Sequence, residues 1–159
     1  MWTVPGQAAT STQLPPSSLR LPRHRRSVGR SRTLLREQAR SWEVPEDAAE
    51  TAVLLLSELM TNACQHAHVS PGREISARCV LRDGTLRLEV PDASDDDWPQ
   101  TRQASPDDES GRGLMLVAAL ADAWDAYPRA CGIGKTVWFE LKLPAAAELR
   151  PAGGPSPTA

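Results

Sequence analysis

Three polar residues with helical spacing are the part of this sequence best suited to chemistry. Glu58, Asn62 and His66 stand at positions i, i+4 and i+8 of one segment, so in a helix they share one face. Residues 48–56 before them are almost entirely apolar, which indicates a helix buried in a core. An unpaired buried polar group costs about 1–3 kcal/mol, so this stripe needs partners, either other side chains or a ligand.

Two further segments carry residues of the same kind. In residues 90–94 a carboxylate, Asp92, follows an apolar strand pattern, and in residues 110–117 two glycines flank an arginine at the start of a helix pattern. Each feature alone has an ordinary structural explanation: a satisfied core pair, the start of a turn, or helix caps. Their joint occurrence in this order is much less expected by chance, so the three segments predict one functional site.

The elements that position these residues follow from periodicity and turn signals. The patterns predict strands at 17–21, 74–82, 85–90, 123–127 and 136–143, and helices at 25–42, 45–67 and 113–121. Asp83-Gly84 between two alternating runs is typical of a hairpin, and Pro91 ends the second strand or confines it to a position without a ladder hydrogen bond. Tight turns between strands imply a mostly antiparallel sheet with helices on one face, an α+β fold of two layers.

The predicted elements form one domain at residues 17–143. Residues 1–16 are rich in Pro, Ser, Thr, Gln and Gly and are predicted to be disordered, and the Ala/Pro/Gly-rich residues 144–159 are predicted to form a flexible tail. The acidic segment 92–110 has no periodicity, and a loop of that length is usually functional or disordered.

Composition excludes several classes of protein. The net charge of −2 over 159 residues gives no argument for nucleic acid, and the eight arginines between Arg20 and Arg40 are interpreted as a solvated helix face. No apolar stretch has the length of a membrane span or of a signal peptide. Three cysteines without a framework spacing indicate reduced thiols. We therefore expect a cytoplasmic protein that binds neither nucleic acid nor membrane.

Other chemical motifs fail on their spacing. Residues 132–136 suggest a phosphate-binding loop, but Arg129 stands where that loop needs a glycine, and a strand follows in place of a helix. Cys64, His66 and His68 match no common zinc spacing and have no second cluster. The chain has no nucleophile-elbow motif, and its three histidines leave little room for a catalytic triad.

The three segments together resemble the small ATP-binding regulators related to the anti-sigma-factor serine/threonine kinases. These belong to the ATPase superfamily of histidine kinases, gyrase, chaperones and mismatch-repair proteins. The resemblance covers residues 17–143, and residues 134–141 are similar to the closing strand of that family. It implies the Bergerat ATP-binding fold, in which ATP lies between the helices and one face of the sheet.

The resemblance also implies a role for each matching residue. Asn62 matches the residue whose amide oxygen holds magnesium, Glu58 matches the general base, and Asp92 matches the carboxylate that binds adenine. Thr136 resembles the residue that completes the adenine site through water. His66 receives no chemical role. The residues whose backbone would approach the phosphates are Gly111, Arg112, Gly113 and Leu114.

The function that this resemblance implies is a magnesium- and ATP-dependent serine/threonine protein kinase of the anti-sigma type. Such a protein phosphorylates a small antagonist protein and can also sequester a sigma factor. The alternative is a nucleotide-dependent binding switch that holds ATP and a partner but transfers no phosphate. A third class, an α+β structural domain without a nucleotide, is the least favoured. Homodimer formation and the identity of the protein partner are left open by the sequence.

Overall fold

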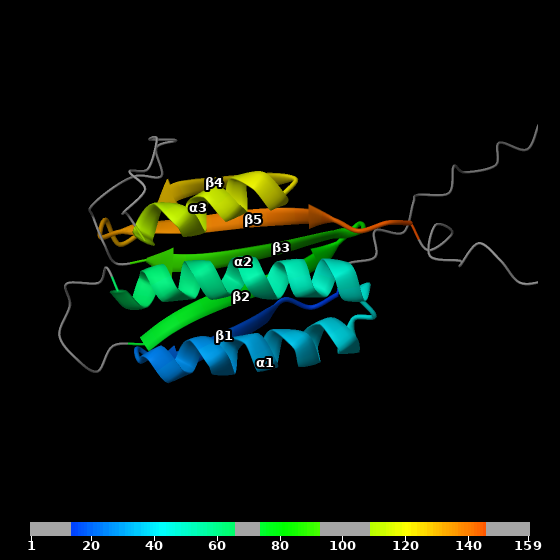
Figure 1. Cartoon of the computed structure of the whole chain (residues 1–159), viewed down its shortest axis with the longest axis horizontal. Helices are drawn as coiled ribbons and strands as arrows, with labels where there is room; N and C mark the ends of the chain where they lie inside the picture. Colours follow the sequence, from blue (N-terminus) through cyan, green and yellow to red (C-terminus); the bar gives the residue numbers. More distant parts are fainter. Residues whose placement is uncertain (1–13, 66–73, 93–108, 146–159) are drawn as a thin grey trace, which may run out of the picture.

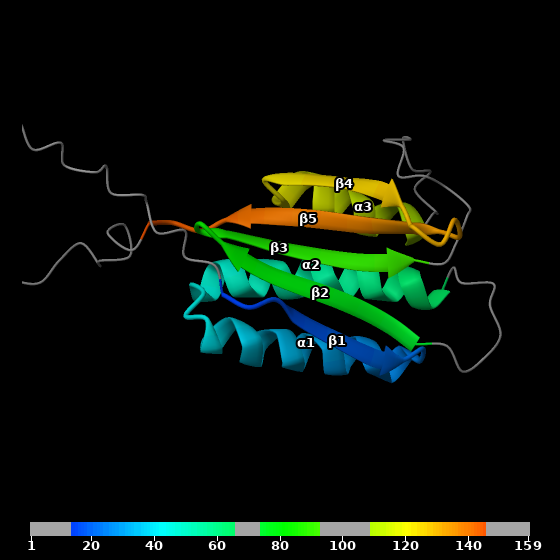
Figure 2. The same ribbon diagram turned by 180° about the vertical axis from the view of Figure 1, so that it is seen from behind.

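The computed structural model describes residues 14–65, 74–92 and 109–145. Within these ranges the chain forms an open five-stranded antiparallel sheet, in the order β1-β2-β3-β5-β4, and three helices. The helices lie on one face of the sheet, with α2 between α1 and α3 (Figures 1 and 2). The predicted two-layer α+β fold is confirmed. The elements are β1 (Ser17–Pro22), α1 (Arg25–Ser41), α2 (Glu46–Gln65), β2 (Glu74–Arg82), β3 (Thr85–Asp92), α3 (Glu109–Leu120), β4 (Ala123–Pro128) and β5 (Lys135–Lys142).

The core lies between α2 and the central strands β3 and β5. In the antiparallel register Leu88 stands opposite Phe139, and both side chains are almost completely buried. From α2, Leu55, Leu56 and Met60 have no exposed surface. The long apolar run of the sequence therefore forms the helix that covers the centre of the sheet, as its composition predicts.

The hairpin between β2 and β3 forms at the predicted turn. Asp83 and Gly84 adopt positive φ angles of 48° and 72°. Two consecutive residues of this kind are typical of the type I′ turn, whose twist matches that of the flanking strands. The turn sets the register in which Leu81 faces Leu86, so the apolar residues of both strands point to the helix-covered face.

Helix α1 has the solvated arginine-rich face that its sequence indicates. Most of its arginines are exposed, while Val28, Leu35 and Ala39 are buried against the domain. The side chain of His24 caps the helix by accepting a hydrogen bond from the backbone amide of Arg26 at 3.1 Å. This helix thus follows the ordinary amphipathic pattern of a surface helix.

Two predicted boundaries near the glycine motif and the proline need correction. Helix α3 begins at Glu109, four residues before the predicted start at residue 113, so Gly111 and Gly113 lie inside it. A helix tolerates such glycines, at about 1 kcal/mol each, when close packing requires them. Strand β3 continues through Pro91 to Asp92. Pairing with β5 carries the strand on through the Pro91–Thr136 and Asp92–Lys135 pairs. The β2–β3 ladder has already ended at the Arg78–Glu89 pair, so Pro91 stands where β2 needs no donor, which is the second of the two outcomes predicted for this proline.

Several predictions fall outside the described residues. These are the disorder of residues 1–13, the looseness of residues 146–159, the position of His66 and the acidic loop up to residue 108. The domain limits 17–143 stay a prediction. Among the helices that the structure describes, none is long and apolar enough to cross a membrane.

The three cysteines are free and differ in burial, so we expect them to react at different rates. Burial raises the pKa of the Cys79 thiol to about 12, and it also raises the pKa of the half-buried Cys64, whereas Cys131 is exposed. Only the thiolate is nucleophilic. In a thiol titration of the native protein at pH 8, Cys131 should therefore react first, and Cys79 only after unfolding. Fast labelling of all three thiols without denaturant would contradict this assignment of burial.

Candidate functional site

The polar stripe of α2 meets the beginning of α3. A Cβ atom built on Gly113 would lie 3.1 Å from Oε2 of Glu58 and 3.3 Å from Nδ2 of Asn62. The two α2 side chains therefore lie together against α3, one turn apart on the same face, as the spacing predicts. A side chain at position 113 would be in tight contact with both residues, so they would have to shift by a few tenths of an ångström to accept even a methyl group. Gly113 itself is buried.

The sheet contributes charged residues at the ends of two neighbouring strands. Asp92 is the last residue of β3 and stands opposite Lys135, the first residue of β5. Their exposed fractions are 7% and 8%. Since side chains alternate along a strand, both residues share the helix-covered face with Val90 and Val137. This face is thus apolar at its centre and charged at one end.

These elements meet at one end of the domain. The C-terminal ends of α2 and β3 and the N-terminal ends of α3 and β5 lie together in both views (Figures 1 and 2). Glu58 and Asn62 lie in the C-terminal half of α2, Gly113 lies in the N-terminal half of α3, and Asp92 is the last residue of β3. The structure thereby places the ends of three segments that are far apart in the sequence at one end of the domain. Such convergence is what a ligand site between the helices and the sheet requires.

Thr136 occupies a different position from Asp92. It stands opposite Pro91 and is buried, but alternation places it on the strand face that carries Trp138 and Glu140. Its predicted contact with adenine through water stays a prediction. The residue on the same face as Asp92 is Lys135, which the sequence analysis missed. Counting back in steps of two from the buried Phe139 places Lys135 on the helix-covered face, but its pairing with Asp92 comes only from the strand register.

The remaining residues of the glycine motif lie in the first turns of α3. Gly111 and Arg112 belong to the helix, and their side chains are outside the described part of the structure. Leu114 packs against the core, and Val117 is completely buried. These apolar contacts anchor α3, so its first turn is held close to the stripe on α2. The backbone amides of a first helical turn have no partner within the helix and are suited to anions.

The donor set fits a magnesium ion held mainly by a bound phosphate chain. Asn62 supplies a neutral amide oxygen, and Mg²⁺ usually takes one or two protein ligands together with phosphate oxygens and water. No cluster of three or more His, Cys, Asp or Glu residues occurs in the described ranges.

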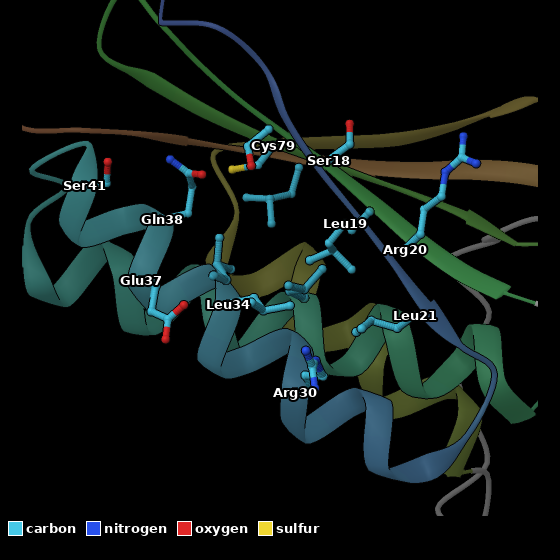
Figure 3. A pocket seen from close by; sticks show the side chains of 15 residues that line it. Ser18, Leu19, Arg20, Leu21, Arg30, Leu34, Glu37, Gln38, Ser41 and Cys79 are labelled. Carbon is cyan, nitrogen blue, oxygen red and sulfur yellow. The ribbon is translucent and has the colours of Figure 1, made fainter.

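A cavity of about 460 Å³ lies elsewhere, between α1 and the edge strand β1. In Figure 3, Leu19 and Leu34 line this cavity, and the polar side chains of Arg30, Glu37 and Gln38 extend from α1. Glu58, Asn62 and Asp92 do not line this cavity. It is separate from the site formed by the predicted residues.

The comparison with protein families shows to which family the chain belongs. Residues 21–141 match the model of the histidine kinase-like ATPase domain. The chain belongs to this family. Membership implies ATP binding, and the matched range includes every described element from α1 to β4 and nearly all of β5. A comparison with curated proteins found no match.

The fold of this ATPase domain is also found in a solved structure. The crystal structure of the RsbU and RsbW domains of Rv1364c from Mycobacterium tuberculosis is similar, with a TM-score of 0.64 and 22% sequence identity. The match covers 82% of this chain, which spans only 33% of the other. At this identity the likeness shows a shared fold and nothing finer.

Replacing Gly113 with alanine should disturb the site of the ATPase domain. The added Cβ would be crowded by Glu58 and Asn62, and overpacking of this kind costs about 1–3 kcal/mol. The matched control is Gly29→Ala in α1, where the nearest atom, on Arg32, is 3.8 Å away. We expect Gly29→Ala to raise the free energy of unfolding by about 0.5–1 kcal/mol. Gly113→Ala should be less stable than that control and should bind ATP more weakly.

Urea unfolding and ATP titration of both variants measure these differences. Equal stability and equal ATP affinity of the two variants would show that α3 does not depend on close approach at Gly113.

Proposed function

We propose that this protein is an ATP-binding regulator of the anti-sigma type and acts as a magnesium-dependent serine/threonine protein kinase. Its protein substrate is a small antagonist protein, and a sigma factor is a second candidate partner. The observation that carries the proposal is the contact of Glu58 and Asn62 with Gly113 at the start of α3, at the end of the domain where β3 places Asp92. We further propose that the protein works in the cytoplasm and forms a homodimer.

The residues divide the work as follows. Asp92 accepts a hydrogen bond from the amino group of adenine. The first turn of α3, which includes Gly111 and Arg112, places backbone amides near the phosphates, and Gly113 and Leu114 follow in the next turn. The amide oxygen of Asn62 holds magnesium, which neutralises charge on the phosphates when it is bound. These contacts orient the nucleotide so that its terminal phosphate lies at the end of α2.

Glu58 then acts as the general base. A serine or threonine hydroxyl oxygen of the antagonist attacks the terminal phosphorus, the bond from that phosphorus to the bridging oxygen breaks, and ADP leaves. Glu58 accepts the hydroxyl proton, so the transferred group ends as a phosphate ester on the antagonist. The carboxylate lies one helical turn from Asn62 on the same helix face, so the base and the metal ligand would face the same bound phosphate.

The Asp92→Asn variant tests the adenine contact. A hydrogen bond to a charged acceptor contributes about 1.5–3 kcal/mol, so loss of the carboxylate should weaken ATP binding by about 10- to 100-fold. The matched control is Asp125→Asn, because Asp125 is exposed on β4 and lies on the other face of the sheet. Titration calorimetry with Mg-ATP measures both affinities. Unchanged affinity in Asp92→Asn would remove Asp92 from the adenine site.

Incubation of the purified protein with labelled Mg-ATP and candidate antagonists tests the whole function. Transfer of label to a serine or threonine supports the kinase. Tight ATP binding without transfer favours the alternative, a nucleotide-dependent switch that sequesters its partner. Failure to bind ATP or ADP would contradict both functions.

A further inference from the structure

Two opposite charges are buried at the end of the sheet. Among the residues whose burial the structure describes, Asp92 and Lys135 are the only charged residues that are buried. Burial of charge is costly, and a buried pair of charges contributes little net stability compared with apolar side chains of similar size. Stability of the fold therefore gives a weak reason for a lysine at this position.

The register places the two side chains beside each other on the face that the helices cover. Asp92 and Lys135 are direct partners across β3 and β5, and directly opposite Cβ atoms in such a pair are about 5 Å apart. The next residues inward on this face are Val90 and Val137, with Ala126 beside them on β4. All three are small and aliphatic. The end of the sheet thus places a hydrogen-bond acceptor, Asp92, and a donor, Lys135, next to an apolar surface made of small side chains.

We propose that Lys135 is a second residue that recognises the base, and that its ammonium donates a hydrogen bond to N1 of adenine while Asp92 accepts from the amino group. This inference rests on the ATP-binding function proposed above. The edge of adenine presents a donor, the amino group, directly beside an acceptor, N1. A carboxylate and an ammonium on neighbouring strands are complementary to that pair of groups.

The inference makes Lys135 a determinant of base specificity. An ammonium has three donors and no acceptor, so it can satisfy N1 and remain next to the Asp92 carboxylate. A hydrogen bond from a charged donor is stronger than a neutral one. Loss of either N1 or the ammonium should therefore weaken binding by about 10- to 100-fold. Removing both N1 and the ammonium should weaken binding no more than removing either, because each change removes the same hydrogen bond between them.

The experiment compares ATP with 1-deaza-ATP, in which a CH group replaces N1. The wild-type protein should bind 1-deaza-ATP about 10- to 100-fold more weakly than ATP. In Lys135→Met the two nucleotides should bind with equal affinity, close to that of 1-deaza-ATP for the wild type. The matched control is Lys142→Met, since Lys142 is the other lysine of the chain and lies exposed at the far end of β5. That variant should keep the wild-type ratio.

A structural role for Lys135 would lower the affinity for both nucleotides together and leave their ratio unchanged, so that outcome overturns the inference. If Lys135→Met fails to fold, the wild-type ratio alone decides, and equal affinity for ATP and 1-deaza-ATP contradicts the N1 contact. In both cases the wild-type protein still binds ATP, so the proposed function stands. Failure of the wild type to bind ATP at all would instead contradict the proposed function, and the inference with it.

Discussion

Replacing Glu58 with glutamine should slow phosphate transfer to the antagonist by about 10²–10⁴-fold, the usual contribution of a general base. Glutamine keeps the size of the side chain, so the contact with Gly113 at the start of α3 is preserved. It cannot accept the hydroxyl proton. Because Glu58 makes no proposed contact with the nucleotide, the affinity for Mg-ATP should change by no more than a few fold. Single-turnover transfer of labelled phosphate and a parallel ATP titration measure the two quantities.

The control for this prediction is Glu37→Gln, which removes an exposed carboxylate from α1. Glu37 lines the separate cavity beside β1 and lies away from the stripe on α2, so both the rate and the affinity should stay at wild-type values. A Glu58→Gln protein that binds ATP and transfers phosphate at the wild-type rate would show that another group takes the proton.

Replacing Phe139 with alanine should lower the free energy of unfolding by about 3–5 kcal/mol. Phe139 has no exposed surface and pairs with Leu88 in the centre of the sheet, beneath α2. Removal of the ring leaves a cavity that neighbouring strands fill only in part. A loss of this size is a large share of the roughly 5–15 kcal/mol that stabilises a typical domain. Urea unfolding followed by circular dichroism measures it.

The adjacent Trp138 provides the control because it lies on the opposite face of β5. Its ring is half-buried and stacks under the guanidinium of Arg87, whose carbon lies 3.9 Å from the ring centre. An exposed cation–π contact contributes about 0.5–1 kcal/mol, so Trp138→Ala should cost much less than Phe139→Ala. If the two variants lost similar stability, the core would not lie on the face that the helices cover.

Local patterns were enough to predict most elements of the fold. Alternation around Asp83-Gly84 predicted the β2–β3 hairpin, and the apolar run before Glu58 predicted the central helix. Both depend on interactions between residues close in the chain, which the sequence displays directly. The start of α3 was predicted less well because its glycines suggest a boundary. The packing of Gly113 against α2 explains why that glycine lies inside the helix.

The candidate site was predicted in the same uneven way. Asn62 was placed beside Glu58 from helical spacing alone, and the structure puts both against α3. Lys135 was overlooked because nothing near it in the sequence resembles a partner. Its neighbour Asp92 is 43 positions away, and the two meet only through the register of β3 and β5. Pairing across strands is long-range, so local patterns do not reveal it.

The sequence by itself determined which segments form helices and strands. It also determined that Glu58 and Asn62 lie on the same face of a helix, because an α-helix has 3.6 residues per turn wherever it lies. The tertiary structure decided which segments meet. It brought Gly113 to that face through the docking of α3 on α2, and it placed Lys135, with Thr136 turned to the other face, opposite Asp92. These contacts arise from packing and strand register, which depend on the whole chain folding around one core.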